Sequence, residues 1–143
     1  MNIDELLVFD TGPLCHFAQE NWLGVLKAVV GKRTAVIPDV VAEELRIGAA
    51  RDRRIHAVLD ATWIGLRELR TDEEITAFTR FSTLLVRGDH NLGEAAVLAL
   101  ASTCGGTAVV DDGAARRAAR QHRVAMKPTL ALLCEAVRLD CSR

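Results

Sequence analysis

The stretch Asn91–Asp112, NLGEAAVLALASTCGGTAVVDD, decides the fold of this chain. Its first part is apolar and rich in alanine, which predicts a helix that ends near Gly105. A β-branched run follows and ends in Asp111-Asp112, which indicates a buried strand. A helix followed closely by an apolar strand is the repeating unit of an α/β protein, so we expect the same alternation in the rest of the chain.

Other apolar runs extend this alternation. We expect further strands at 3–9, 34–37, 63–66 and 124–126, and helices at 14–19, 22–30, 40–46, 51–61, 71–86, 113–122 and 129–139, with a polar loop at 87–90. The strands are apolar throughout, as a parallel sheet buried on both faces requires. We therefore predict one α/β domain over residues 1–143, with a central parallel sheet of four to five strands flanked by helices.

Local signals predict where two of the helices begin or end. Asp39 follows a proline-ended strand and is expected to cap the next helix, which Gly48 is expected to end. Thr71 and Glu74 have the spacing of a capping box at the start of the helix at 71–86.

Composition narrows the class of protein. The formal net charge of −1 argues neither for nor against a nucleic-acid partner, and no apolar run reaches the length of a membrane span. The first ten residues carry acids where a signal peptide carries basic residues, so we expect a cytoplasmic protein without a membrane partner. Four cysteines without a C-x-x-C pattern are interpreted as core thiols, not as a zinc site.

Carboxylates follow or accompany the predicted strands in four separate segments. Asp10 ends the first strand, and Asp111-Asp112 end a later one. Glu44 lies about two helical turns after the second strand, and Glu94 lies in the first turn of the helix before the strand that carries Asp111. Because the carboxyl ends of parallel strands share one rim, we expect these acids to converge there.

Each acid also has a local interpretation. Asp10 and Asp112 are each placed to cap a helix, and Asn91 with Glu94 has capping-box spacing. The local interpretation of Glu44 is simple exposure to solvent. Considered one at a time, Asp112 and Glu94 are each better explained as helix-capping residues. Taken together, crowded carboxylates raise one another's pKa and cost stability, a cost that a cation offsets. Hard oxygen ligands suit Mg²⁺ or Mn²⁺, and such a cluster is able to support phosphodiester hydrolysis.

The order and wording of these segments resemble the four motifs of PIN-domain nucleases. The matching segments are LLVFDTGPL (6–14), IPDVVAEELRIG (37–48), LGEAAVLALA (92–101) and AVVDDGAARRAAR (108–120). The resemblance extends from Ile3 to about Leu139 and includes the closing KPTLALLCEA. Asn91 stands where the most similar subgroup has a glycine, and Lys127-Pro128 replaces a glycine in the tail.

The resemblance implies a metal-dependent endoribonuclease, in which a metal-activated water attacks RNA in line. Small PIN proteins of this kind are commonly VapC-like toxins of toxin–antitoxin pairs. By position, Asp10, Glu44, Glu94 and Asp112 would be the catalytic acids that bind Mg²⁺ or Mn²⁺. Asp111 and Asp112 each fit the fourth motif, and we favour Asp112, with Asp111 supporting it as a further metal ligand.

The resemblance also implies supporting residues and partners. Thr11 is expected to orient Asp10 or a water. Glu44 is preferred to Glu43 because the family's glutamate directly precedes a leucine. Independently of the resemblance, the arginine-rich helix that follows Asp112 is expected to contact RNA phosphates or to neutralise the acidic rim, with Arg116, Arg117 and Arg120 as its candidate residues. The expected partners are an RNA substrate, a cognate antitoxin protein and a second copy in a homodimer.

Alternatives remain open at this point. One is a PIN-type scaffold that only binds an antitoxin or RNA. Another is a phosphatase of the haloacid dehalogenase type, which also has a strand ending in Asp. That chemistry normally needs a second acid two residues later, where Gly12 stands. A receiver domain is ranked lower still, because its acidic pair comes early in the chain.

Overall fold

A five-stranded parallel sheet forms the centre of the described structure, a computed structural model that describes residues 2–85 and 91–141. The strands are β1 (Leu6–Phe9), β2 (Thr34–Pro38), β3 (Ile64–Arg67), β4 (Thr107–Val109) and β5 (Met126–Lys127). Their order is β3-β2-β1-β4-β5, and each neighbouring pair is parallel. The predicted fold class and the predicted sheet are confirmed.

β1 lies at the centre, where the strand order changes direction. It pairs with β2 on one side and with β4 on the other, so that Leu7 is opposite both Ala35 and Thr107. The side chains of Leu7, Val8 and Phe9 are fully buried, which explains the continuous apolar run. In an open parallel sheet, such a switch point is where ligands bind, beyond the carboxyl ends of the strands.

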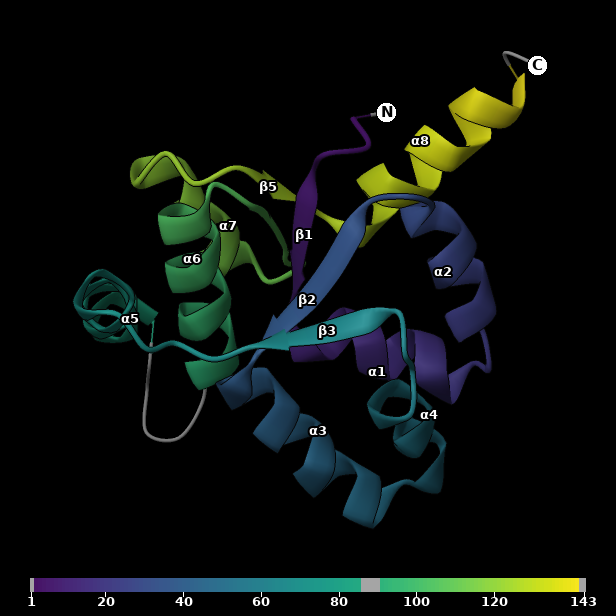
Figure 1. Cartoon of the computed structure of the whole chain (residues 1–143), viewed down its shortest axis with the longest axis horizontal. Helices are drawn as coiled ribbons and strands as arrows, with labels where there is room; N and C mark the ends of the chain where they lie inside the picture. Colours follow the sequence, from purple (N-terminus) through teal and green to yellow (C-terminus); the bar gives the residue numbers. More distant parts are fainter. Residues whose placement is uncertain (1, 86–90, 142–143) are drawn as a thin grey trace.

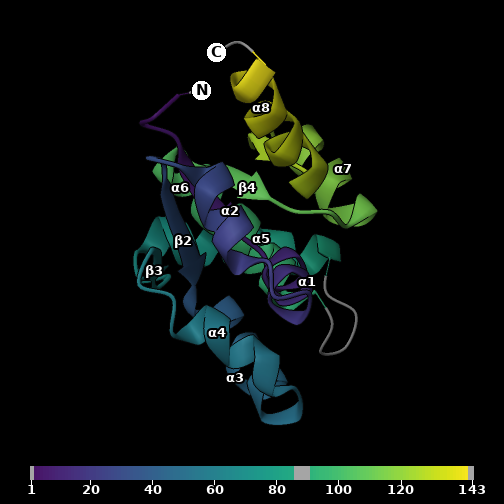
Figure 2. The same cartoon turned by 90° about the vertical axis from the view of Figure 1, so that its right-hand side faces the viewer.

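Helices cover both faces of the sheet. They are α1 (Thr11–Gln19), α2 (Leu23–Val30), α3 (Asp39–Arg51), α4 (His56–Leu59), α5 (Asp72–Leu85), α6 (Leu92–Cys104), α7 (Gly113–Gln121) and α8 (Thr129–Cys141). Figure 1 shows α5, α6 and α7 on one side and α1, α2 and α8 on the other. In Figure 1 and Figure 2 alike, α3 and α4 lie at the opposite end of the molecule from α8.

α6 packs against β1, β2 and β4 and is covered from outside by α5. Its residues 95–101 are all buried, which explains a helix that is apolar on every side. The helix therefore fixes its own first turn, with Glu94, against the carboxyl ends of the central strands.

Two boundaries around α3 were predicted wrongly. Asp39 is the first helical residue, not the cap, and its carboxylate accepts a hydrogen bond from Leu69 N at 3.4 Å. α3 passes through Gly48 to Arg51. Gly48 instead permits a close approach of Ile55, whose Cδ1 would lie 3.2 Å from a Cβ at that position.

The helix expected at 51–61 is also wrong in extent. Asp52 interrupts it, because its side chain accepts a hydrogen bond from Arg54 N at 3.1 Å and so begins a new turn. A 3-10 turn (Arg53–Ile55) and the four-residue α4 follow. Both short elements pack on α3.

Helix starts elsewhere follow their predicted signals in part. Thr71 Oγ1 accepts from Glu74 N at 3.1 Å, as a capping box requires, but Glu74 Oε2 accepts from Arg70 N, one residue earlier than expected. α1 begins at Thr11, three residues before its predicted start, because Asp10 caps it. The predicted loop at 87–90 lies outside the described residues.

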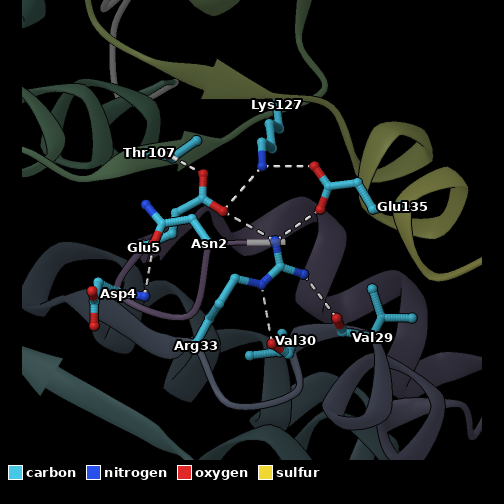
Figure 3. A network of polar contacts seen from close by, with 9 residues as sticks. All are labelled: Asn2, Asp4, Glu5, Val29, Val30, Arg33, Thr107, Lys127 and Glu135. Carbon is cyan, nitrogen blue, oxygen red and sulfur yellow. Dashed lines mark hydrogen bonds and ion pairs between the residues drawn. The ribbon is translucent and has the colours of Figure 1, made fainter. Parts of the chain in front are cut away.

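Buried charges hold α8 to the start of the sheet. Arg33, which is 5% exposed, pairs with Glu5 at 3.0 Å and with Glu135 of α8 at 2.8 Å, as Figure 3 shows. Lys127 bridges the same two carboxylates at 3.0 and 2.7 Å. Burial alone would raise the pKa of Glu5, but hydrogen bonds from Lys127, Thr107 and Arg33 outweigh that effect and lower it.

Two further expectations concern the environment of the chain. Across residues 2–85 and 91–141, we find no helix with the length and hydropathy needed to cross a bilayer. Cys15 and Cys104 are partly buried free thiols, whereas Cys134 is exposed, so the core-thiol interpretation is wrong for that residue.

Candidate acidic site

Asp10 lies at the switch point of the sheet, directly after β1. Its backbone N–H donates to Val109 O at 3.2 Å, which ties the end of β1 to the end of β4. Its side chain is 6% exposed and accepts a hydrogen bond from Thr11 N at 2.8 Å. The predicted cap and the predicted site residue are thus the same buried carboxylate.

Glu44 reaches this place from the second turn of α3. Thr11 Oγ1 donates a hydrogen bond to Glu44 Oε1. Thr11 therefore contacts two of the predicted acids, Asp10 through its backbone and Glu44 through its hydroxyl. Glu43, the rejected alternative, is exposed and pairs with Arg46 at 2.6 Å.

Gly93 is a residue of the site that the sequence analysis missed. A Cβ at this position would overlap with Glu44 Oε1 and would lie 3.2 Å from Asp10 Oδ1. The two carboxylates therefore pack against the bare backbone of the first turn of α6. The signal for Gly93 in the sequence is its place directly before Glu94, at the start of a helix where glycine is otherwise unfavourable.

Glu94 lies in the same turn and is partly buried. The predicted capping box with Asn91 is wrong. Asn91 adopts a left-handed conformation, with φ of 70°, and its side chain donates to Leu85 O at 3.0 Å, not to the start of α6. Glu94 is thus not half of a reciprocal cap, which leaves its placement among the acids as the feature to explain.

Asp111 and Asp112 make different contacts after β4. Asp112 Oδ2 accepts from Ala115 N at 3.0 Å, so the predicted cap of α7 is confirmed. Asp111 instead accepts from Thr129 N at 2.8 Å and from Thr129 Oγ1 at 2.7 Å, at the start of α8. Both aspartates are exposed.

Four of the predicted acids lie close enough to affect one another's pKa: Asp10, Glu44, Glu94 and Asp112. The pKa of Asp10 is raised to about 8, and burial of the carboxyl group is the largest cause. The Glu94 carboxylate is the next largest, and the Glu44 and Asp112 carboxylates raise the pKa further, while the hydrogen bond from Thr11 N–H lowers it. Burial also raises the pKa of Glu94, against a backbone hydrogen bond that lowers it, and Asp112 and Glu44 add to the increase. The site therefore holds negative charge that nothing within the cluster compensates.

Two hollows meet at Asp10, and both are also lined by Gly12 and Glu94. One, of about 400 Å³, continues toward Asp111, Asp112 and Thr129. The other, of about 700 Å³, continues toward Glu44, Asn91 and Arg51. A chain molecule lying across Asp10 would therefore find open space in both directions.

Arg51 is a second residue of the site that the sequence analysis did not single out. It follows the acids as the last residue of α3 and lines the larger hollow. The predicted phosphate-binding arginines Arg116, Arg117 and Arg120 line neither of these two hollows. The Nη1 atom of Arg117 would lie 3.4 Å from a Cβ at Gly113, the residue that follows Asp112.

The donor chemistry fits a hard divalent cation. All four clustered groups are carboxylates, the ligands that Mg²⁺ and Mn²⁺ prefer, and their repulsion favours a cation. Among the residues that the structure describes, no three His, Cys, Asp or Glu side chains are already arranged to hold one ion. The carboxylates therefore supply suitable charge and donor atoms, but no three of the described side chains are already placed at metal-binding distances.

Comparisons with known proteins show the family and the fold. A family model described as a PIN domain, DUF3368, matches residues 6–141. The fold is similar to a chain of the crystal structure of VapBC2 from Rickettsia felis bound to a DNA fragment from its promoter. That match has a TM-score of 0.62 and 12% sequence identity, and covers 86% of this chain and 98% of the other. The sequence comparison with curated proteins found no match.

Proposed function

Because the chain belongs to the PIN domain family DUF3368, we propose that it is a metal-dependent endoribonuclease and the toxin of a toxin–antitoxin pair. The observation that carries this proposal is the repulsion among Asp10, Glu44, Glu94 and Asp112 at the switch point of the sheet. Four carboxylates in such a place cost stability unless a cation binds there. Family membership favours a nuclease over the phosphatase alternative.

The four acids are the proposed ligands of Mg²⁺ or Mn²⁺. When bound, the metal would supply an activated water for in-line attack on an RNA phosphodiester and would stabilise the charge that develops on its oxygens. Asp10 is the central ligand in this proposal, since it is the most buried of the four and all three others act on its pKa.

The surrounding residues orient these acids. Thr11 fixes Asp10 and Glu44 relative to each other, and the missing side chain of Gly93 lets both lie against α6. Arg51 is placed in the larger hollow, where a guanidinium group would bind an RNA phosphate next to the cleaved one. The two hollows on either side of Asp10 suit a substrate that continues in both directions.

The proposed partners follow from the proposed class. RNA is the substrate, an antitoxin protein is the inhibitor, and the protein acts in the cytoplasm as a homodimer. The similarity to a chain of the VapBC2 complex supports the fold on which these proposals rest.

A paired experiment tests the proposed function. Purified protein is incubated with RNA in Mg²⁺, in Mn²⁺ and with a chelator, and the same chain is expressed without a partner. We expect cleavage only with metal, arrest of growth, and loss of both effects in Asp10→Asn. Asp60→Asn, at an exposed position at the end of α4, is the matched control and should act as the unaltered protein does.

Two results contradict the proposal. The first is an absence of RNA cleavage with either metal. The second is growth arrest that Asp10→Asn leaves unchanged. A stable complex with a protein partner but no cleavage would instead support the scaffold alternative.

A further inference from the structure

Two adjacent aspartates at the end of β4 are held in different ways. Asp112 caps its own helix, α7, with one oxygen, Oδ2. Asp111 uses both carboxylate oxygens on a single residue 18 positions later, accepting from the backbone N–H and from the hydroxyl of Thr129. A carboxylate with both oxygens engaged in this way is tied to its donors in position and in orientation.

The geometry separates the same two residues. Asp112 lines the smaller hollow together with Asp10 and Glu94 and uses only Oδ2 in its cap, whereas both oxygens of Asp111 accept hydrogen bonds. Asp111 lies in the wall of the smaller hollow, next to Thr129, where its charge is directed to the start of α8. A carboxylate at a helix N-terminus is favoured by the free N–H groups and by the helix dipole.

Thr129 stands between two spaces of the molecule. It lines the acidic hollow that contains Asp10. It also lines a separate, mostly apolar pocket of about 390 Å³ between α1, α2 and α8, whose walls include Phe17, Trp22 and Leu133. Together with His16 and Phe17, which also line both spaces, Thr129 thus forms the boundary of the space beside the acids.

Apolar packing also holds α8, through Leu132 and through Leu133 and Ala136, which pack against the core. Among its described side chains, Leu132 is fully buried, and Glu135 forms the ion pairs with Arg33 and Lys127 further along the helix. Leu130, in the first turn, is 68% exposed. The contact between Asp111 and Thr129 therefore fixes the first residue of α8, at the end that faces the site, in addition to the packing of Leu132.

We propose that Asp111 is a positioning residue that holds Thr129 and the start of α8 as a wall of the acidic site, and that Asp112 is the metal ligand of the pair. This inference rests on the proposed nuclease function for its effect on RNA. The anchoring itself is a property of the fold. Asp111 then acts on the reaction through the shape of the hollow, not through the metal.

The test compares Asp111→Asn, Thr129→Val and Asp112→Asn, with Thr129→Ser as the conservative variant. Amide hydrogen exchange of residues 129–135 reports on α8, and calorimetric titration with Mn²⁺ alone reports on metal affinity. We expect Asp111→Asn and Thr129→Val to speed exchange of the first turn of α8 by at least about tenfold. Thr129→Ser, which keeps the hydroxyl, should exchange as slowly as the unaltered protein. The double variant Asp111→Asn/Thr129→Val should exchange no faster than either single variant, because both changes break the same contact.

The effect on metal affinity should differ between the variants. We expect Asp112→Asn to weaken Mn²⁺ binding by at least about tenfold, and Asp111→Asn and Thr129→Val by less than about threefold. On RNA, these last two should raise KM more than they lower kcat, and Thr129→Ser should restore KM.

Either of two results overturns the inference: unchanged exchange at α8 in Asp111→Asn, or a loss of Mn²⁺ affinity in Asp111→Asn as large as in Asp112→Asn. If the unaltered protein neither binds Mn²⁺ nor cleaves RNA, the proposed function fails. The exchange measurement then still decides the anchoring of α8.

Discussion

Gly93 lies so close to Glu44 that any side chain at position 93 would collide with the Glu44 carboxylate. The same absent side chain leaves room for Asp10 Oδ1, which would lie 3.2 Å from a Cβ at Gly93. Two acids from different segments thus share one gap in the surface of α6. This gap lets both carboxylates pack against the first turn of α6.

We predict that Gly93→Ala displaces both carboxylates. Metal affinity and RNA cleavage should each fall by at least about tenfold, measured by Mn²⁺ titration and by initial rates. Alanine normally stabilises a helix by about 1 kcal/mol relative to glycine, so a gain in stability would be expected if the site had space. Gly24→Ala in α2 is the control, because a Cβ there meets nothing within 4 Å. Normal cleavage by Gly93→Ala would contradict this account of the gap.

Asp10→Asn should stabilise the metal-free protein while removing its response to metal. The folded protein holds the pKa of Asp10 at about 8, so folding at neutral pH takes up a proton that asparagine does not need, and the substitution removes that cost. We expect the free energy of unfolding at neutral pH, without metal, to rise by more than about 1.4 kcal/mol, the equivalent of one pKa unit. Thermal unfolding with and without Mn²⁺ measures both effects. A variant that is less stable than the unaltered protein, and is still stabilised by Mn²⁺, would show that repulsion at Asp10 is not the controlling feature.

The charges that hold α8 should make the fold sensitive to acid. Burial would raise the pKa of Glu135, but hydrogen bonds from Lys127 and Arg33 outweigh it and lower the pKa from its ordinary value of 4.5. A carboxylate with a lowered pKa stabilises the fold above that ordinary value, and the contribution is lost as the pH falls through the lowered pKa. Stability should therefore decline as the pH is brought below about 4.5.

Glu135→Gln tests the origin of that decline. At pH 7 we expect it to lower the free energy of unfolding by about 1.5–3 kcal/mol, the value of charge-assisted hydrogen bonds. The difference from the unaltered protein should shrink in acid, as denaturant titrations at several pH values would reveal. Glu68→Gln removes an exposed pair with Arg70 and should cost less than about 1 kcal/mol. Equal effects of the two variants would argue against a special role for the buried network.

Arg51 should contribute to RNA binding more than its neighbours do. Arg51→Gln is expected to raise KM for RNA by about three- to tenfold with little change in kcat, since it removes one phosphate contact in the larger hollow. Arg53→Gln removes the same charge from an adjacent exposed position and is the control. Steady-state kinetics at two salt concentrations measure the difference. If both variants behave alike, the effect is one of overall charge.

The fold was predictable because its signals are local. Apolar β-branched runs such as 107–110 mark buried strands, and acids that directly follow strands, such as Asp10, fall at the rim by topology. Gly48 was misinterpreted because the sequence alone does not distinguish a glycine that ends a helix from a glycine that makes room for a neighbouring side chain. Gly93, Arg51 and the contact of Asp111 with Thr129 depend on segments that are distant in sequence, so no local pattern reports them.

The most direct test of the central claim is the rate of metal-dependent RNA cleavage by Glu94→Gln beside the unaltered protein. Glutamine keeps the size of the side chain and removes the charge, which is the property that the proposed site requires. We predict that cleavage falls by more than about 100-fold, while the melting temperature of the metal-free protein is maintained or raised, because the carboxylate repulsion is reduced. Cleavage at the unaltered rate would contradict the claim that these carboxylates form a metal-dependent nuclease site.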